Sequence, residues 1–169
     1  IQKDVDAIVI MGSDNLMTTK AIDTYIAWME GGQDFLGYKG VHMLNPSQSK
    51  AIRLDGYIGS RSSETYGPGR AFSIATARKI GSSPFADRIN QGLDGSFQQT
   101  LAKRAPKLDS LILPSLGFGK WFEVKSDINI WDIDDFISPH HKYNKLPYAE
   151  CLDLIDDLKT KVDINRAML

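Results

Sequence analysis

Apolar residues in the first half of the chain fall into short runs that are separated by polar turns. Residues 5–11 are a β-branched apolar run, which is typical of a buried strand, and residues 12–15 follow as a turn. Residues 40–44 and 54–59 are two further short apolar runs that predict strands. Before these two runs, residues 16–30 have the spacing of an amphipathic helix. The apolar face of that helix is predicted to carry Ile22, Tyr25, Ile26 and Met29.

The second half alternates between helical and strand patterns. Residues 71–80 have a helical pattern, and an apolar residue at every fourth position predicts a helix over 85–101. Its stripe is formed by Phe85, Ile89, Leu93, Phe97 and Leu101. Residues 109–114 and 121–131 predict two strands joined by a glycine-containing turn, and residues 148–162 predict a final helix.

These elements together predict an α/β or α+β fold, with a mixed central sheet flanked by helices. The segment 131–144 is expected to form loops. A chain of 169 residues is long enough for one packed core, so we expect a single domain over 1–169. Within it, residues 1–80 are expected to form an N-terminal α/β part and residues 81–169 a catalytic core.

The cysteine content and the length of the apolar runs indicate the cellular location to expect. Cys151 is the single cysteine, so no disulfide can form within the chain and a reducing, cytoplasmic location is expected. No apolar run approaches the roughly 20 residues that cross a bilayer, and the chain does not open with a signal-peptide pattern, so no membrane contact is expected.

The charge is distributed unevenly along the chain. The formal net charge is −1, but residues 50–125 carry 12 Lys and Arg against 6 Asp and Glu. Both flanking segments are acidic. A basic middle can present a positive surface to a polyanion, and ordinary fluctuation in composition explains the same pattern equally well.

The segment that ends at Lys125 carries the clearest candidate chemistry. Side chains alternate along a strand, so Glu123 and Lys125 are predicted to lie on one face while Phe122 and Val124 point to a core. Pairing of this strand with residues 109–114 would bring Asp109 to Glu123. Two carboxylates in a polar site suit Mg²⁺, and a neighbouring lysine can position an attacking water. The alternative is a solvated strand face with cross-strand ion pairs.

Asp109, followed after thirteen residues by Glu123-Val124-Lys125, resembles the signature of the PD-(D/E)XK nucleases. The resemblance implies a restriction-endonuclease-like core and a Mg²⁺-dependent endonuclease that hydrolyses phosphodiester bonds in DNA. Asp109 and Glu123 would bind the metal, and Lys125 would activate water. A homodimer would match a two-fold DNA site.

The sequence after this strand is similar to that of short type II restriction endonucleases. It contains the motif SPHHKYN, with a histidine pair at His140 and His141. The resemblance implies that these histidines contact bases in the major groove. Lys142 and Lys145 would contact phosphates of the DNA.

Two other functions are compatible with the sequence. The strand and turn over residues 5–15 resemble the opening of a nucleotide-binding α/β fold, although the glycine-rich phosphate motifs are absent. In that case the chain is an enzyme or binding domain for a nucleotide or sugar phosphate, and Gly12–Asn15 and residues 61–70 line its cleft. The other candidate is a non-catalytic structural or assembly protein.

Overall fold

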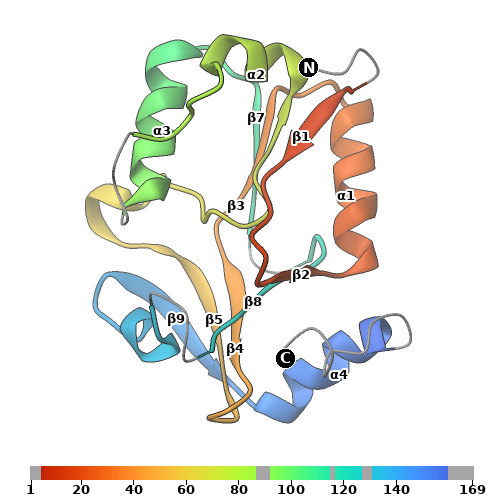
Figure 1. Cartoon of the computed structure of the whole chain (residues 1–169), viewed down its shortest axis with the longest axis vertical. Helices are drawn as coiled ribbons and strands as arrows, with labels where there is room; N and C mark the ends of the chain where they lie inside the picture. The colour runs from red at the N-terminus through yellow and green to blue at the C-terminus, as the bar shows by residue number, and fades with distance from the viewer. Residues whose placement is uncertain (1–4, 87–91, 115–116, 127–130, 160–169) are drawn as a thin grey trace.

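The protein contains two mixed β-sheets that lie end to end (Figure 1). The structure is a computed structural model and describes residues 5–86, 92–114, 117–126 and 131–159. The first sheet has the strand order β1-β6-β3-β7 and contains β1 (Ala7–Val9), β3 (Phe35–Tyr38), β6 (Ala71–Ser73) and β7 (Ser110–Leu113). The second has the order β2-β8-β4-β5-β9 and contains β2 (Asn15–Met17), β4 (Val41–Asn45), β5 (Lys50–Tyr57), β8 (Trp121–Val124) and β9 (His141–Leu146).

Helices cover these sheets. The described residues form the α-helices α1 (Thr19–Glu30), α2 (Ile74–Ile80), α3 (Leu93–Arg104) and α4 (Tyr148–Lys159). Two short 3₁₀ helices are η1 (Gly59–Arg61) and η2 (Ile133–Phe136). The mixed α/β class is therefore as predicted, although the strands form two sheets rather than one central sheet. None of the helices described is long and apolar enough to cross a membrane.

Strands β3 and β4 follow each other almost directly and connect the two sheets, and β7 and β8 pair alongside them. Only Lys39 and Gly40 separate β3 from β4. Strand β7 runs parallel to β3, and β8 runs parallel to β4. Each sheet thus contains strands from both 1–80 and 81–169, and those two segments are interleaved in space.

The expected pairing of residues 109–114 with residues 121–131 is wrong. Strands β7 and β8 lie one after the other along β3 and β4, and they belong to different sheets. A hairpin would require these strands to be antiparallel neighbours. Strand β7 instead pairs in parallel with β3, and β8 pairs in parallel with β4. Parallel strands of this kind are usually covered on both faces.

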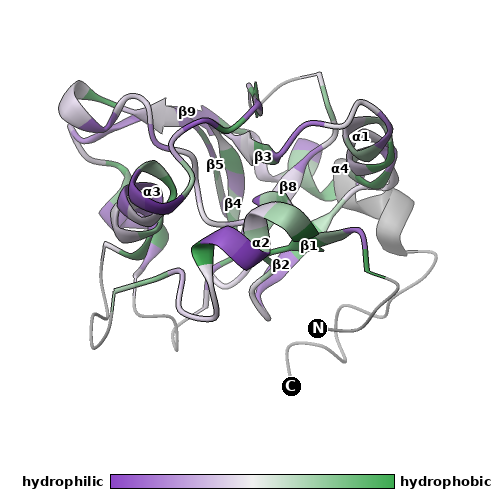
Figure 2. Ribbon diagram, turned by 90° about the horizontal axis from the view of Figure 1, so that it is seen from above, coloured by the Kyte–Doolittle hydropathy of each residue, from purple (hydrophilic) through white to green (hydrophobic). Residues whose placement is uncertain are grey.

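The first sheet is packed between helices on its two faces (Figure 2). Because side chains alternate along β3, Leu36 packs with Tyr25 and Trp28 of α1, whereas Phe35 packs with Phe97 of α3. The second sheet is also covered on both faces along β8. Trp121 belongs to the cluster beneath α1, and its neighbour Phe122 packs with Cys151 of α4.

The buried face of α1 differs from the predicted one. Tyr25 and Trp28 are buried, as is Ala21, whereas the predicted core residues Ile22, Ile26 and Met29 are 42–46% exposed. Helical spacing is satisfied by either stripe. The buried stripe carries the larger aromatic rings, and the hydroxyl of Tyr25 donates a 2.6 Å hydrogen bond to the carbonyl of Gly69.

Other boundaries also differ from the sequence prediction. Residues 71–73 of the helix predicted over 71–80 form strand β6, and β8 ends at Val124. Residues 15–17 form strand β2 before the helix begins, because they pair with β8. The helix predicted over 85–101 begins at Leu93, although Phe85 still packs against Phe97 with ring centroids 5.5 Å apart. Ile89 lies outside the described residues. Residues 141–146 form β9 rather than a loop, because they pair with β5.

Candidate functional site

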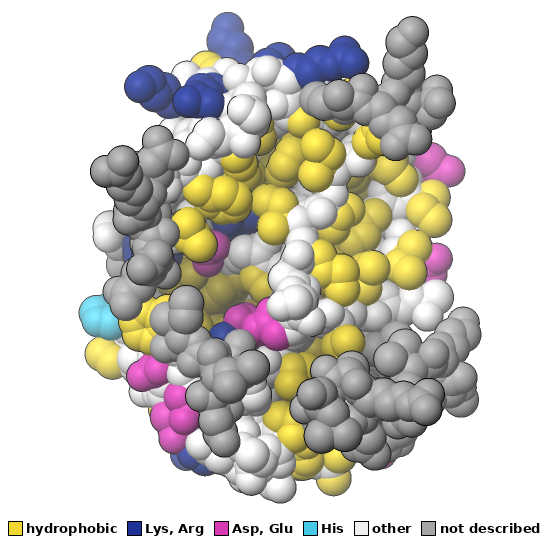
Figure 3. Space-filling model, viewed as in Figure 1, with side chains coloured by type: hydrophobic (Ala, Val, Ile, Leu, Met, Phe, Trp, Pro, Cys, Tyr) yellow, Lys and Arg dark blue, Asp and Glu magenta, His cyan; other side chains and the backbone are white. Residues whose placement is uncertain are grey.

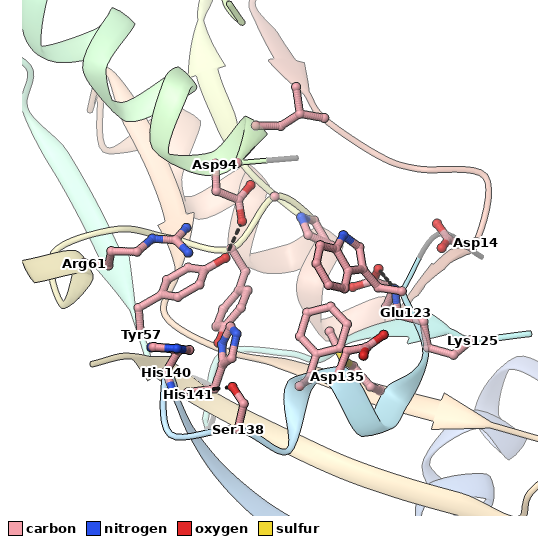
Figure 4. Close-up of a pocket in the computed structure, with 18 residues that line it drawn as sticks. Asp14, Tyr57, Arg61, Asp94, Glu123, Lys125, Asp135, Ser138, His140 and His141 are labelled. Carbon is pink, nitrogen blue, oxygen red and sulfur yellow. Dashed lines mark hydrogen bonds and ion pairs between the residues drawn. The ribbon is translucent and has the colours of Figure 1, made fainter. Parts of the chain in front are cut away.

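A cavity of about 600 Å³ opens between the N-terminus of α3, strands β5 and β8, and η2. Figure 3 shows this face of the molecule hollowed near its middle, with acidic side chains at the hollow. Its charged lining residues are Asp14, Arg61, Asp94, Glu123, Lys125 and Asp135 (Figure 4). Ser138, His140 and His141 add further polar groups to the wall. The site therefore combines four carboxylates with two cations and a histidine pair.

The turn that follows β1 places Asp14 at this cavity. The backbone N–H of Gly12 donates a 2.7 Å hydrogen bond to Oδ1 of Asn15, and this bond closes the turn. The carbonyl of Asp14 accepts a 2.8 Å hydrogen bond from the N–H of Val124, and Asn15 pairs with Glu123 in the sheet. These contacts fix the carboxyl groups of Asp14 and Glu123 on the same wall.

Glu123 and Lys125 form an ion pair inside the cavity. Their side chains lie on the same side of the chain, as the strand pattern predicted, and Lys125 Nζ donates a 2.5 Å hydrogen bond to Glu123 Oε1. Lys125 is only 4% exposed. Burial raises the pKa of Glu123, whereas the positive charge of Lys125 lowers it. Glu123 is thus a carboxyl group whose proton affinity is increased by its surroundings.

Asp94 is held by a buried arginine. It lies in the first turn of α3, where the helix dipole favours a negative charge. Its Oδ1 is 3.1 Å from the guanidinium of the fully buried Arg70, and its Oδ2 accepts a 2.7 Å hydrogen bond from the hydroxyl of Tyr57. Arg70 also donates a 2.9 Å hydrogen bond to Oγ1 of Thr65. Asp94 is therefore tightly oriented toward the cavity.

Aromatic rings form the part of the wall beside Asp94. The rings of Tyr57 and Tyr66 stack with centroids 4.5 Å apart, and the guanidinium of Arg61 lies 3.8 Å above the Tyr57 ring. The hydroxyl of Tyr66 shares a 2.7 Å hydrogen bond with Nδ1 of His141. Burial and the neighbouring Arg61 lower the pKa of His141, which favours the neutral form of this ring.

The structure separates the residues of the predicted nuclease site. Glu123, Lys125, His140 and His141 line one cavity. Asp109 does not join them, because it immediately precedes β7 at the far end of the β3–β4 run, where its N–H donates to Oδ2 of Asp34. Asp109 lies at the level of Asp34 and Glu123 pairs with Met43, so nine positions of the β3–β4 run, at about 3.3 Å each, separate them by on the order of 20–30 Å. The predicted metal pair is therefore not formed.

The two predicted phosphate contacts lie outside the cavity. Lys142 and Lys145 are exposed on β9 and do not line the cavity wall. The structure brings in three carboxylates that the motif search did not select, which are Asp14, Asp94 and Asp135. Asp14 belongs to the predicted Gly12–Asn15 turn, and Arg61 and Tyr66 belong to the predicted 61–70 cleft segment. No local pattern distinguishes Asp94, because its role depends on Arg70.

A metal ion in this cavity would need a bound substrate to supply some of its coordinating oxygens. Among the described residues, no group of three or more His, Cys, Asp or Glu side chains is arranged to hold a metal ion. Asp14 lines the cavity, and carboxylate oxygens are the donors that Mg²⁺ prefers. Asp14 would hold a Mg²⁺ ion whose remaining ligands are water and the oxygens of a bound substrate.

Comparison with known proteins gave no match among family models, curated proteins or solved structures. The functional argument therefore rests on the chemistry of the cavity.

Proposed function

We propose that this chain is an enzyme that binds a nucleotide-linked sugar in the cavity and transfers the sugar from its phosphate to a hydroxyl group. The observation that carries the proposal is the convergence of Asp14, Asp94 and Glu123 beside stacked aromatic rings in one cavity. Phosphate, sugar hydroxyls and the sugar ring each require a different type of group. All three types are present on this wall.

The Asp14 side of the cavity suits the phosphates. Mg²⁺ in proteins is commonly held by one or two carboxylates together with substrate phosphate oxygens. Asp14 would hold such an ion together with phosphate oxygens and water, and the bound ion would neutralise phosphate charge. Arg61 is the partly exposed cation of the opposite wall, with a side chain 40% exposed, and it can contact a phosphate oxygen directly.

The Asp94 side suits the sugar. A carboxylate accepts hydrogen bonds from sugar hydroxyls. The stacked rings of Tyr57 and Tyr66 form a rigid apolar wall beside it, although Arg61 and the stacking itself occupy the faces of Tyr57. Arg70 and Tyr57 fix the orientation of Asp94, so the energetic cost of ordering this side chain is already met before a ligand binds. Asp94 is thus a positioning group for the sugar hydroxyls.

Glu123 is the proton acceptor in this proposal. The acceptor hydroxyl oxygen forms a bond to the anomeric carbon, and the bond from that carbon to the phosphate oxygen breaks with its electron pair passing to the phosphate. The hydroxyl proton goes to Glu123. Burial raises the pKa of this carboxyl group and so makes it a stronger base, while the charge of Lys125 opposes that rise and favours the ionised form.

The test is release of nucleoside diphosphate from UDP-glucose, UDP-N-acetylglucosamine and GDP-mannose with Mg²⁺ or Mn²⁺, water serving as the acceptor. Turnover of one of them is expected to fall about 100-fold or more in Glu123→Gln. Asp109→Asn is the matched control, because this carboxylate is exposed and lies outside the cavity. Absence of both turnover and calorimetric binding of all three compounds would contradict the proposal.

A nuclease is the second candidate, favoured by the presence of Glu123, Lys125, His140 and His141 on one wall. It is tested by cleavage of plasmid DNA with Mg²⁺, using EDTA and Glu123→Gln as controls. Metal-dependent cutting that Glu123→Gln loses would support this candidate. Retention of cutting in Asp109→Asn would then show that the active site lacks the expected aspartate.

A further inference from the structure

Two large apolar side chains at the cavity remain exposed. Leu93 is 42% exposed and Trp131 is 40% exposed, and both line the cavity. The other two tryptophans, Trp28 and Trp121, are 2% and 1% exposed. Exposing an indole ring to water leaves a large apolar area uncovered. Among the described residues that line the cavity, Leu93 and Trp131 are the large apolar side chains that stay exposed, and they share the wall with charged and hydrogen-bonding groups.

The positions of these two residues place them next to the proposed chemistry. Leu93 begins α3 and directly precedes Asp94. Trp131 precedes the N-cap of η2, which contributes Asp135 and Phe136 to the cavity. The two exposed side chains therefore come from the elements that carry the carboxylates Asp94 and Asp135.

We infer that Leu93 and Trp131 form a subsite for the sugar that accepts the transferred group, with a pyranose ring stacked on the indole of Trp131. The inference rests on the proposed function and names its acceptor class. A pyranose has an apolar C–H face and a rim of hydroxyl groups. The indole and Leu93 cover the apolar face, and Asp135, Ser138 and His140 on the same wall provide hydrogen-bonding groups for the rim.

A nucleobase is the other ring that stacks on tryptophan, and the hydrogen-bonding groups beside Trp131 favour the sugar. The base is attached to the phosphates, which the proposed function puts at Asp14 and Arg61. The hydrogen-bonding side chains that follow Trp131 in sequence are a carboxylate, a hydroxyl and a histidine, which match a set of hydroxyl groups. We therefore assign this subsite to an uncharged sugar.

Tryptophan fluorescence tests the inference directly. Because Trp28 and Trp121 are buried, acrylamide quenching of the full-length protein reports mainly on Trp131. The probes are the methyl glycosides of glucose, galactose, mannose and N-acetylglucosamine, with maltose and cellobiose, each in the presence of UDP. One of these sugars is expected to protect Trp131 saturably and to lower the quenching constant by about half. Protection by uridine alone, or by none of the sugars, overturns the subsite.

Variants separate stacking from general damage to the fold. Calorimetric affinity for the protecting sugar is expected to fall about tenfold or more in Trp131→Ala, and less in Trp131→Phe, which keeps an aromatic face. Phe118→Ala is the matched control, since Phe118 is 44% exposed and does not line the cavity. Unchanged affinity in Trp131→Ala, or an equal loss in Phe118→Ala, overturns the inference.

The same samples distinguish failure of the subsite from failure of the proposed function. Turnover of a nucleotide sugar without any protection of Trp131 by the glycosides overturns the subsite alone. Protection by a glycoside without binding or turnover of any nucleotide sugar supports a sugar site and overturns the proposed transfer activity.

Discussion

Lys125 donates a 2.5 Å hydrogen bond to Glu123, and both side chains are largely enclosed by the protein. The ion pair lies next to Phe136 of η2, since Nζ of Lys125 is 5.0 Å from the centre of that ring. Burial favours the neutral form of Glu123, and the positive charge of Lys125 favours its charged form. The charge state of Glu123 therefore depends directly on Lys125.

Replacing Lys125 with methionine is expected to raise the pKa of Glu123 further, because the positive charge that lowers it is lost while burial remains. The acidic limb of nucleotide-sugar turnover would then move to higher pH. The measurement is the pH dependence of kcat/KM in the two proteins. Lys142→Met, which removes an exposed lysine of β9, is expected to leave the limb in place. If the acidic limb of the pH profile does not move in Lys125→Met, a group other than Glu123 titrates in that limb.

Arg70→Met is expected to destabilise the protein by about 3–5 kcal/mol, because it leaves the carboxylate of Asp94 without its buried partner. Arg61→Met is the matched control. The side chain of Arg61 is 40% exposed in its ion pair with Glu64, so its loss is expected to cost about 1 kcal/mol or less. Urea unfolding of both variants measures the difference. Equal costs would mean that the Arg70–Asp94 pair has no special role in stability.

Gly119→Ala is expected to be among the most damaging single substitutions. Gly119 has φ +89°, and an added Cβ would overlap the backbone of α1, lying 2.6 Å from Cα of Ala21. We expect a loss of more than about 3 kcal/mol or failure to fold. Gly117→Ala provides the comparison, because φ is +99° there and nothing lies within 4 Å of the added carbon. Gly117→Ala should lower the free energy of unfolding by about 1–2 kcal/mol, which is the cost of a side chain at positive φ alone.

His42 makes the stability of the protein depend on pH. Burial, with the charges of Lys120 and Arg53, lowers its pKa to about 4, whereas Asp55 opposes that effect. Below pH 6.5 the unfolded chain binds this proton and the folded chain does not, so stability falls as the pH falls from 6.5 toward 4. Between pH 7 and pH 4.5 this group is expected to account for about 2–3 kcal/mol.

His42→Gln removes the titrating ring and tests that contribution. Urea unfolding at the two pH values is expected to show a smaller loss on acidification in the variant than in the parent protein. An identical loss in both proteins would assign the pH dependence to other groups. The ring also lies against Phe122, with centroids 5.1 Å apart, so some loss of stability at pH 7 is expected as well.

Local patterns predicted most of the helices and strands. They failed where two buried faces, or two strand pairings, fitted the pattern equally well. The apolar run at residues 5–11 contains β1, and the run at 109–114 contains β7. The alternation expected along β8 did not hold for burial. Trp121 and Phe122 are both buried, because α1 covers one face of this strand and α4 covers the other. A sequence alone does not show how many faces of a strand will be covered.

The sequence by itself determined the mixed α/β class and the placement of Glu123 beside Lys125, because strand alternation and turn chemistry act over a few residues. Only the tertiary structure decided which carboxylates share a cavity. It added Asp14 and Asp94 to Glu123 and kept Asp109 at the far end of the β3–β4 run. Strand order depends on contacts between distant segments that bury apolar faces from both sides, and no local spacing encodes that choice.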